Sequence, residues 1–350
     1  MTITEVAGLH LPSTGLAVPW SGLDRLPRRP DEFSFVLLSD RTGLARPGVY
    51  ERAVDITNLL RPDFALQVGD MIEGYTSDPL ELERQWAEFD AIADGFEVPF
   101  FRTPGNHDVS NDLMRAEWRR RHGLLYYHYR YRDVLFVVLD TQDPPQRLED
   151  FSADGLVADE FEKRIERMRE LQRSDPAKLA AMVEGMMDWS GTMPANISDQ
   201  QVAWAEEVIA ANAGVRWTVL SMHIPAWQGA GHPGLDRIRR VLGDRPYTMF
   251  AGHTHNYRRT VIDGRDHIRL GATGGLWCHD GDDGNFDHVT LVTVSDSDLK
   301  IANVVLEGVI GKDGGAFRPT PWSTPLRREP AGRERLHARG IDDPQRGPTP

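Results

Sequence analysis

Short apolar runs alternate with stretches of helical spacing through the first third of the chain. The runs near 33–39, 63–69 and 98–103 are bounded by Gly, Pro or Asp, which is typical of buried strands. After each run, apolar residues recur every three or four positions, and this spacing predicts a helix. The helices are expected over about 48–60, 80–93 and 110–121. The alternation of strand and helix predicts the βαβ units of a layered α/β domain.

The pattern then changes to a mixture of hairpins and α/β units. The segment 126–140 predicts a hairpin whose second strand, Val134 to Leu139, is buried. Further on, Ser198 is a suitable N-cap for a helix over 199–211. Strands at 217–222 and 247–251 and a short helix at 234–242 are expected to follow. Four late strands look antiparallel, near 257–262, 266–271, 287–294 and 298–305.

Three segments do not follow this pattern of strands and helices. Residues 1–32 contain four prolines and no periodicity, so we expect an arm on the surface of a main domain that spans 33–310. A polar excursion at about 141–198 interrupts that domain, and its helical spacing favours a helical cap. Residues 311–350 are rich in Pro, Gly, Arg and Glu, which predicts a flexible C-terminal tail.

Composition narrows the classes of protein that remain. The 350 residues are 40% hydrophobic and 27% charged, enough for one large globular domain or two small ones. No apolar run approaches the ~18 to 20 residues of a membrane span, and the N-terminus resembles no signal peptide. We therefore expect a cytoplasmic protein without a membrane partner, and the single cysteine, Cys278, excludes an internal disulfide. The net charge of −13 argues against binding of long nucleic acids.

Polar motifs follow five of the predicted strands at their carboxyl ends. We expect these motifs to place two Asp, one Asn and three His on the same rim of one sheet, where open α/β sheets bind ligands. Each motif alone has an ordinary structural explanation, such as a turn, a loop cap or a core histidine, but five in order along one chain favour a site. The motifs are Asp40, Gly69-Asp70, Gly105-Asn106-His107-Asp108, His223 and Gly252-His253-Thr254-His255.

The residue types in these motifs suit a pair of metal ions. Carboxylate, amide and neutral imidazole groups bind divalent Mn, Fe, Ni or Zn, and a bridging carboxylate can hold two ions roughly 3.5 to 4 Å apart. Such a pair binds phosphoryl oxygens, offsets the charge that builds in the transition state and lowers the pKa of a bound water. Phosphate esters gain most from this chemistry.

The order of the motifs resembles the calcineurin-like metallophosphoesterase superfamily, over Phe33 to about Asn303. The resemblance implies a layered α-β-β-α fold, in which helices flank a β-sandwich and two metals lie above one sheet edge. It implies that Asp70 bridges the ions, that Asp40 and His255 belong to the first site, and that Asn106, His223 and His253 complete the second.

The resemblance also implies a role for the residue beside the substrate. His107 would stabilise the transition state or protonate the leaving group, since imidazole titrates near neutrality. Asp108 would orient the ring of His107, or would simply cap the loop.

Thr42 departs from the superfamily pattern, in which the first motif is Asp-x-His. A hydroxyl is a poorer ligand than imidazole for these metals, so the first site is expected to bind more weakly or to complete its shell with water. Three interpretations follow: a binuclear centre with a labile first ion, a mononuclear centre, or a protein that binds without catalysis. We favour the first, because His107 and all four ligands of the second site are retained.

Three further residues are weaker candidates. Glu73 would support a metal-bound water or a ligand histidine, or would lie in a solvated turn. Arg41 would reach a substrate phosphate, or would be an ordinary surface arginine. His279 follows a glycine-rich turn near the predicted rim and would contact substrate, or would be a surface residue.

The sequence therefore predicts a metal-dependent phosphoesterase that hydrolyses a phosphate mono- or diester through a metal-activated hydroxide. The alternative is a non-catalytic binding module with an incomplete first metal site. A small phosphorylated molecule is the expected substrate. The sequence does not choose between monoesters and diesters, and it identifies no protein partner.

Overall fold

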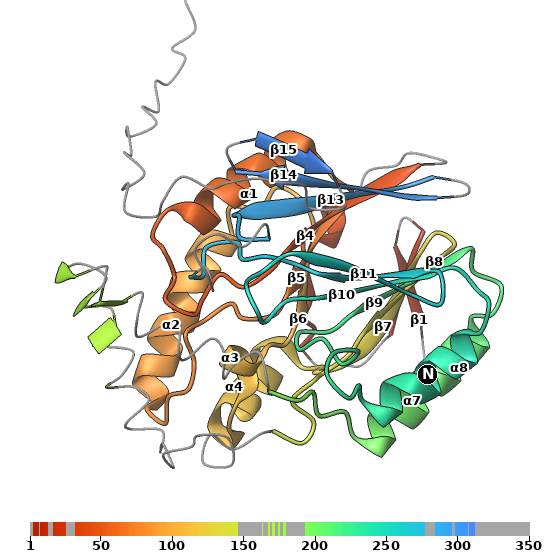
Figure 1. Ribbon diagram of the computed structural model, residues 1–350, viewed down its shortest axis with the longest axis horizontal. Helices are drawn as coiled ribbons and strands as arrows, with labels where there is room; N and C mark the ends of the chain where they lie inside the picture. Colours follow the sequence, from red (N-terminus) through yellow and green to blue (C-terminus); the bar gives the residue numbers. More distant parts are fainter. Residues whose placement is uncertain are drawn as a thin grey trace, which may run out of the picture. The chain divides into compact units, whose positions relative to one another are not determined.

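Two mixed β-sheets pack face to face, and helices cover their outer faces (Figure 1). The computed structural model describes residues 3–6, 8–12, 17–25, 32–145, 193–276, 284–295, 298–306 and 308–311, with scattered positions between 163 and 179. All of these belong to the first of the chain's two compact units, Met1–Arg318. The predicted α-β-β-α architecture is confirmed.

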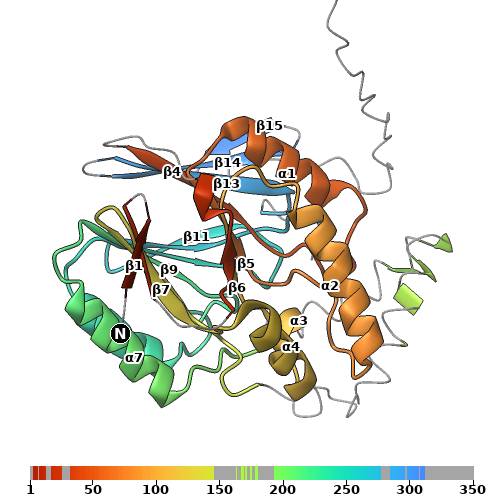
Figure 2. The ribbon, with the colours of Figure 1, turned by 180° about the vertical axis from the view of Figure 1, so that it is seen from behind.

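One sheet has the strand order β15-β14-β13-β4-β5-β6-β3. Its parallel centre consists of β4 (Phe33–Leu38), β5 (Phe64–Val68) and β6 (Phe100–Thr103). The helices that connect these strands, α1 (Val49–Leu60) and α2 (Pro79–Ala93), lie on its outer side, as Figure 2 also shows from behind. Antiparallel strands complete the sheet: β13 (His288–Val294), β14 (Leu299–Val305), β15 (Gly308–Gly311) and β3 (Trp20–Ser21). Helices α3 (Asn106–Val109) and α4 (Asp112–His122) follow β6.

The other sheet has the order β1-β2-β7-β8-β9-β10-β12-β11. Its parallel strands are β8 (Val134–Val138), β9 (Trp217–Ser221), β10 (Tyr247–Ala251) and β12 (Arg265–Arg269). Helices α7 (Asp199–Ala211) and α8 (Pro233–Leu242) cover its outer face. The predicted hairpin is present, because β7 (Tyr127–Tyr131) pairs antiparallel with β8. The expectation for β12 was incomplete: it pairs antiparallel with β11 (Arg258–Ile262) but parallel with β10.

Aromatic side chains fill the space between the two sheets. Phe35 stacks on Phe64 with ring centroids 5.4 Å apart, and Tyr129 stacks on Phe136 at 4.7 Å. On the outer faces, apolar residues of the helices pack against the opposite sides of the same strands. The central strands are thus buried on both faces, which explains why the sequence shows them as continuous apolar runs.

The N-terminal segment is not the irregular arm that the sequence predicted. Strands β1 (Ile3–Val6) and β2 (Leu9–Pro12) extend one sheet through the pairing of Leu9 with Tyr131. Strand β3 extends the other, with Trp20 opposite Phe101. These strands have two to four residues each, too few to show a periodicity, and edge positions tolerate nearby prolines.

The two ends of the predicted insertion lie side by side. Gln142 and Asn196 form a parallel bridge, and the Asn196 amide donates to the Thr141 carbonyl at 2.9 Å. Most of the segment between them lies outside the described residues, as do residues 312–350, so the helical cap and the flexible tail remain predictions. In the described part of the chain, none of the helices has the length and apolar character needed to cross a bilayer.

Candidate metal centre

The predicted ligands meet at one rim of the double sheet. Strands β4, β5 and β6 of one sheet and β9 and β10 of the other each end just before one of the polar motifs. The expectation of a single sheet was therefore wrong. Parallel strands present their carboxyl ends at the same edge of each sheet, and the packing of the two sheets brings the loops at these edges together. All six candidate ligands are buried there: Asp40, Asp70, Asn106, His223, His253 and His255.

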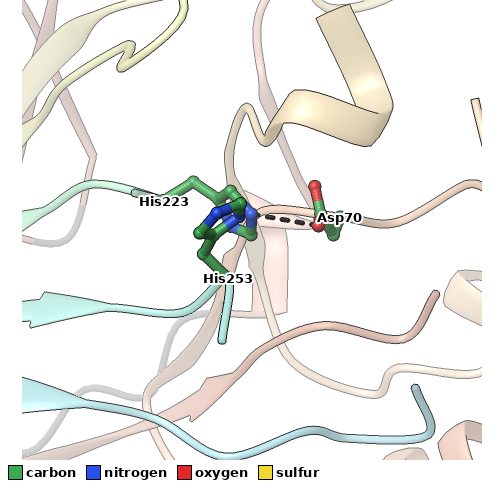
Figure 3. Close-up of side chains that lie close together, drawn as sticks. All are labelled: Asp70, His223 and His253. Atoms are coloured by element: carbon green, nitrogen blue, oxygen red, sulfur yellow. Dashed lines mark ion pairs between the residues drawn. The ribbon is translucent and has the colours of Figure 1, made fainter. Parts of the chain in front are cut away.

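The first of two overlapping groups consists of Asp70, His223 and His253, whose ligand atoms lie within 4.8 Å of one another. Figure 3 shows the His223 imidazole directed toward the Asp70 carboxylate, and the His253 ring lies 5.3 Å from the ring of His223, centroid to centroid. The His223 Nε2 lies 3.0 Å from the Asp70 Oδ2. The Asn106 Oδ1 adds an oxygen to this group, 2.9 Å from the His253 Nδ1.

The second group consists of Asp40, Asp70 and His255, also within 4.8 Å. The His255 Nε2 lies 3.3 Å from the Asp40 Oδ1, and the backbone N–H of His253 donates to the same oxygen at 2.9 Å. Asp70 belongs to both groups, which is the position that the resemblance implied for a bridging carboxylate.

Backbone strain concentrates at these residues. Asp40, Asp70, His253 and His255 have φ angles of +36°, +57°, +78° and +53°, a region that residues other than glycine rarely adopt. Such strain persists only where the surrounding structure enforces it, and it clusters at functional sites. Gly69 allows the turn before Asp70, because it has φ +82° and a Cβ there would lie 2.2 Å from the His223 Nδ1.

Backbone carbonyls fix the orientation of two imidazoles. The His223 Nδ1 lies 2.9 Å from the Val68 carbonyl, and the His255 Nδ1 contacts the Leu276 carbonyl. A carbonyl oxygen only accepts, so each Nδ1 carries the proton, which leaves each Nε2 with a lone pair in the neutral ring. This arrangement is typical of metal-binding histidines.

Charge within the centre is balanced between carboxylates and imidazoles. Burial alone lowers the pKa of His223, but Asp70 and Asp40 outweigh burial and raise this pKa to about 9. Burial acts to raise the pKa of Asp70, but His223 and His107 outweigh it and hold the pKa well below its usual range. Burial likewise lowers the pKa of His255, whereas Asp40 opposes burial and the net pKa is raised.

These residues fit a pair of divalent cations. The His223 Nε2 is buried and makes no hydrogen bond within the described residues, although it faces the Asp70 carboxylate. Two buried carboxylates, a carboxamide oxygen and three imidazoles are also the donors that Mn, Fe, Ni and Zn accept. Cations would take over the charge balance that imidazole protons provide here, because binding of metal displaces protons from its ligands.

His107 lies beside the buried ligands and is partly exposed. Its side chain is 14% exposed, and its Nε2 is 4.0 Å from the Asp70 Oδ2. Its Nδ1 contacts the Glu73 carbonyl at 2.6 Å. Its Nε2 is therefore directed toward the candidate centre.

Asp108 corresponds to the loop cap rather than to the partner of the His107 ring. Its carboxylate is buried and accepts hydrogen bonds from the amides of Asp70, Met71 and Gly105, each at 2.8 Å. Burial and the charge of Asp70 raise the pKa of Asp108 to about 7, although the backbone amides oppose this shift. The contact to the His107 Nδ1 comes instead from the Glu73 carbonyl.

The weaker candidates have structural contacts. The Glu73 carboxylate accepts from the amides of Leu44 at 3.1 Å and Ala45 at 2.8 Å, so it holds the loop after the first motif. The Arg41 guanidinium is buried, donates to the Met71 carbonyl at 3.0 Å and pairs with Glu88, and it therefore stabilises the packing against α2. The expectations of a surface arginine and of a solvated turn were both wrong.

Two remaining residues bear on the first metal site. The Thr42 Oγ1 is buried without a hydrogen-bond partner among the described residues. His279 lies outside the described residues, so its contact with substrate stays a prediction. Sequence reasoning missed Tyr75, which contacts both Asn106 and His107, because a lone aromatic residue after a turn carries no signal of metal chemistry.

A β-sandwich that gathers carboxylates and imidazoles at the carboxyl ends of its parallel strands defines the class of the metallophosphoesterases. A family model described as calcineurin-like phosphoesterase matches residues 9–257, and the chain belongs to that family.

The structure is similar to several solved structures at low sequence identity, two of which are phosphatases. A dimetal phosphatase from Danio rerio is 16% identical with a TM-score of 0.53, and the match covers 81% of this chain and 99% of that one. A purple acid phosphatase from yellow lupin (Lupinus luteus) is 13% identical with a TM-score of 0.53, covering 83% and 53%. The structure of PhoD is 12% identical with a TM-score of 0.52, covering 89% and 74%. At these identities the likeness shows the fold, and a comparison with curated proteins found no match.

Proposed function

We propose that the protein hydrolyses phosphate esters with two divalent cations held at the rim of the double sheet. The observation that carries this proposal is the shared carboxylate of Asp70, which belongs to both buried ligand groups. Asp40 and His255 would hold one cation, and Asn106, His223 and His253 the other. The likeness to dimetal and purple acid phosphatases supports the same assignment.

The cations and the residues of this chain would have different roles in the reaction. Bound cations would supply charge for the phosphoryl oxygens and lower the pKa of a water molecule. Asp108 holds the backbone of Asp70 and Gly105 in place through hydrogen bonds. In its doubly protonated form, His107 would donate the Nε2 proton to the departing alkoxide and keep the Nδ1 proton on the Glu73 carbonyl, since its Nε2 is directed toward the centre.

The substrate class follows from charge. With a net charge of −13, the chain is a poor partner for long nucleic acids, and a small phosphorylated molecule in the cytoplasm is the proposed substrate. Among the described residues, no specific feature favours the binding-module alternative.

Removal of metal tests the proposal directly. Chelated protein should not hydrolyse p-nitrophenyl phosphate or bis-p-nitrophenyl phosphate, and added Mn²⁺ should restore hydrolysis of at least one of them. Asp70→Asn and His253→Ala should remain inactive with Mn²⁺, because each change removes a ligand of the centre. A wild-type protein that binds Mn²⁺ without hydrolysing either ester would support the binding module instead.

The metal content of the protein tests the first site. We expect two equivalents of Mn²⁺ per chain, the one at Asp40 and His255 being more weakly bound, because a hydroxyl replaces an imidazole at Thr42. Thr42→His should tighten this equivalent, as measured by elemental analysis and by titration with Mn²⁺. If the wild type holds one equivalent and Thr42→His holds two, the native centre is mononuclear and the mechanism must use a single ion.

A further inference from the structure

A short segment, Glu73–Thr76, runs alongside the loop and helix that carry Asn106 and His107. The Glu73 carbonyl contacts the His107 Nδ1 at 2.6 Å, and the Thr76 carbonyl accepts from the Asn111 Nδ2 at 3.0 Å. Between them, the Tyr75 hydroxyl accepts from the Asn106 Nδ2 at 2.8 Å. The segment therefore contacts both a candidate metal ligand and the candidate proton donor.

The conformation of this segment is unfavourable for an isolated chain. Tyr75 has φ +50°, which residues with a side chain rarely adopt. Gly74 has φ +61°, and a Cβ there would lie 1.6 Å from the His107 carbonyl oxygen. The Gly74 amide is held by the Gln85 Oε1 at 2.7 Å. Helix α2 thus holds the segment against the Gly105-Asn106-His107-Asp108 motif.

The two ends of the Asn106 carboxamide have different partners. Its Oδ1 lies 2.9 Å from the His253 Nδ1, within the centre, and its Nδ2 donates to Tyr75. Asn106 is 3% exposed, so an Nδ2 without an acceptor would be costly. A cation on the Oδ1 would draw electron density from the amide and strengthen the donation from Nδ2, so the two bonds support each other.

The Tyr75 ring has a separate contact with His107. The two ring centroids are 4.8 Å apart and the planes meet at 83°, an edge-on arrangement. The hydroxyl and the ring of Tyr75 therefore act on two different residues of the site.

From these contacts we infer that Tyr75 is a positioning residue, whose hydroxyl keeps the Asn106 oxygen directed at the metal and whose ring holds the His107 imidazole. This inference rests on the proposed metal centre. The Glu73–Thr76 segment would thereby fix the positions of Asn106 and His107 relative to each other.

Tyr75→Phe separates the two contacts, because it removes the hydroxyl and retains the ring. Titration with MnCl₂ alone, followed by calorimetry, should show that the equivalent weakened by Asn106→Ala is also weakened by Tyr75→Phe, by about 10- to 100-fold. At saturating Mn²⁺ the kcat of Tyr75→Phe should fall less than that of Tyr75→Leu, because the ring that contacts His107 is retained. Tyr75→Leu removes the ring as well and should also lower kcat at saturating Mn²⁺, by up to about 10²-fold.

Two controls make the result specific. Tyr126→Phe alters a half-buried tyrosine that packs on Trp204, at a centroid distance of 4.9 Å, and should leave Mn²⁺ affinity unchanged. In the Asn106→Ala background, Tyr75→Phe should have no further effect on affinity, because the hydroxyl acts through Asn106.

The outcomes separate the inference from the proposed function. If Tyr75→Phe binds Mn²⁺ with wild-type affinity, the role of the hydroxyl is overturned. The proposed metal centre would still stand in that case, because the wild type binds the metal. A wild type that binds no Mn²⁺ would overturn the proposed centre and the inference with it. A loss of affinity in Tyr75→Phe that persists in the Asn106→Ala background would show that Tyr75 acts by another route, and this also overturns the inference.

Discussion

Replacing His107 with alanine should lower kcat by about 10² to 10⁴-fold, the usual contribution of a positioned acid or base. The Mn²⁺ content should not change, because the backbone amide of His107, rather than its ring, donates to the Asp70 carboxylate, at 3.0 Å. The measurement is steady-state turnover at saturating Mn²⁺, with metal content determined on the same samples.

The leaving group decides which role His107 has. A p-nitrophenolate departs without a proton, whereas an alkoxide requires one, so a general acid contributes far more to hydrolysis of an alkyl ester. His107→Ala should therefore lose more activity toward an alkyl phosphate than toward a p-nitrophenyl phosphate of the same charge. An equal loss for both esters would contradict proton donation and leave stabilisation of the transition state as the role. His10→Ala is a control that should change neither rate, because His10 lies on β2, a strand that precedes none of the candidate ligands.

The positions of the candidate ligands could be predicted from the sequence because each of them follows closely on a strand that the sequence marks clearly. Asp40 comes two residues after the apolar strand β4, and His253 two residues after β10. Parallel pairing brings the carboxyl ends of strands together within one sheet. The candidate ligands come from two sheets, so their convergence also depends on how the sheets pack, which the sequence did not show. No knowledge of side-chain direction was needed for this step.

Side-chain direction is what the sequence could not supply. Arg41 follows Asp40, whose φ is +36°, and its guanidinium pairs with Glu88 on α2, a contact that the sequence pattern gave no means to predict. Asp108 and Glu73 are polar residues in loops, and their partners are backbone amides whose positions depend on the folded turns. Hydrophobic periodicity contains no information about such turns, so cap and ligand cannot be told apart before the structure is known.

The early strands were missed for a related reason. A strand of two to four residues has too few positions to show alternation. Leu9 and Trp20 are buried because the sheets present β7 and β6 as partners, which is a property of the tertiary structure.

Replacing Arg115 with methionine should lower the free energy of unfolding by about 3 to 5 kcal/mol, the usual effect of removing one partner from a buried ion pair. Arg115 lies on α4 and is 6% exposed, and Asp140, just after β8, is fully buried. The guanidinium donates to the Asp140 Oδ2 at 2.9 Å and to the Gln142 carbonyl at 2.7 Å. Without Arg115 the Asp140 carboxylate would remain buried without its cation, and urea denaturation monitored by circular dichroism measures the loss.

The effect should depend on pH in a defined direction. Burial raises the pKa of Asp140, and Arg115 opposes this shift. In Arg115→Met the pKa in the folded state rises further above that of the unfolded chain, so the folded state binds the proton more readily. Stability that depends on this proton is lost as pH rises, and the deficit relative to wild type should be smaller at pH 5 than at pH 8.

Two further variants show whether the buried charge is the cause. Arg115→Met/Asp140→Leu should recover most of the lost stability, because no charge is left uncompensated. Arg120→Met, on the same helix but with exposed ion pairs, should change stability little. If the double variant is no more stable than Arg115→Met, the loss comes from packing rather than from charge.

The ion pair matters to function because of where it lies. Thr141, next to Asp140, accepts from the Ile224 amide at 3.0 Å through its Oγ1, and Ile224 directly follows His223. Arg115 therefore joins the helix that follows the Gly105-Asn106-His107-Asp108 motif to the loop that carries the candidate metal ligand His223 from the other sheet. Arg115→Met should consequently weaken Mn²⁺ binding as well as stability, measured at a temperature where the variant is folded. Unchanged affinity in the folded variant would mean that the two sheets hold the ligands in place without this connection.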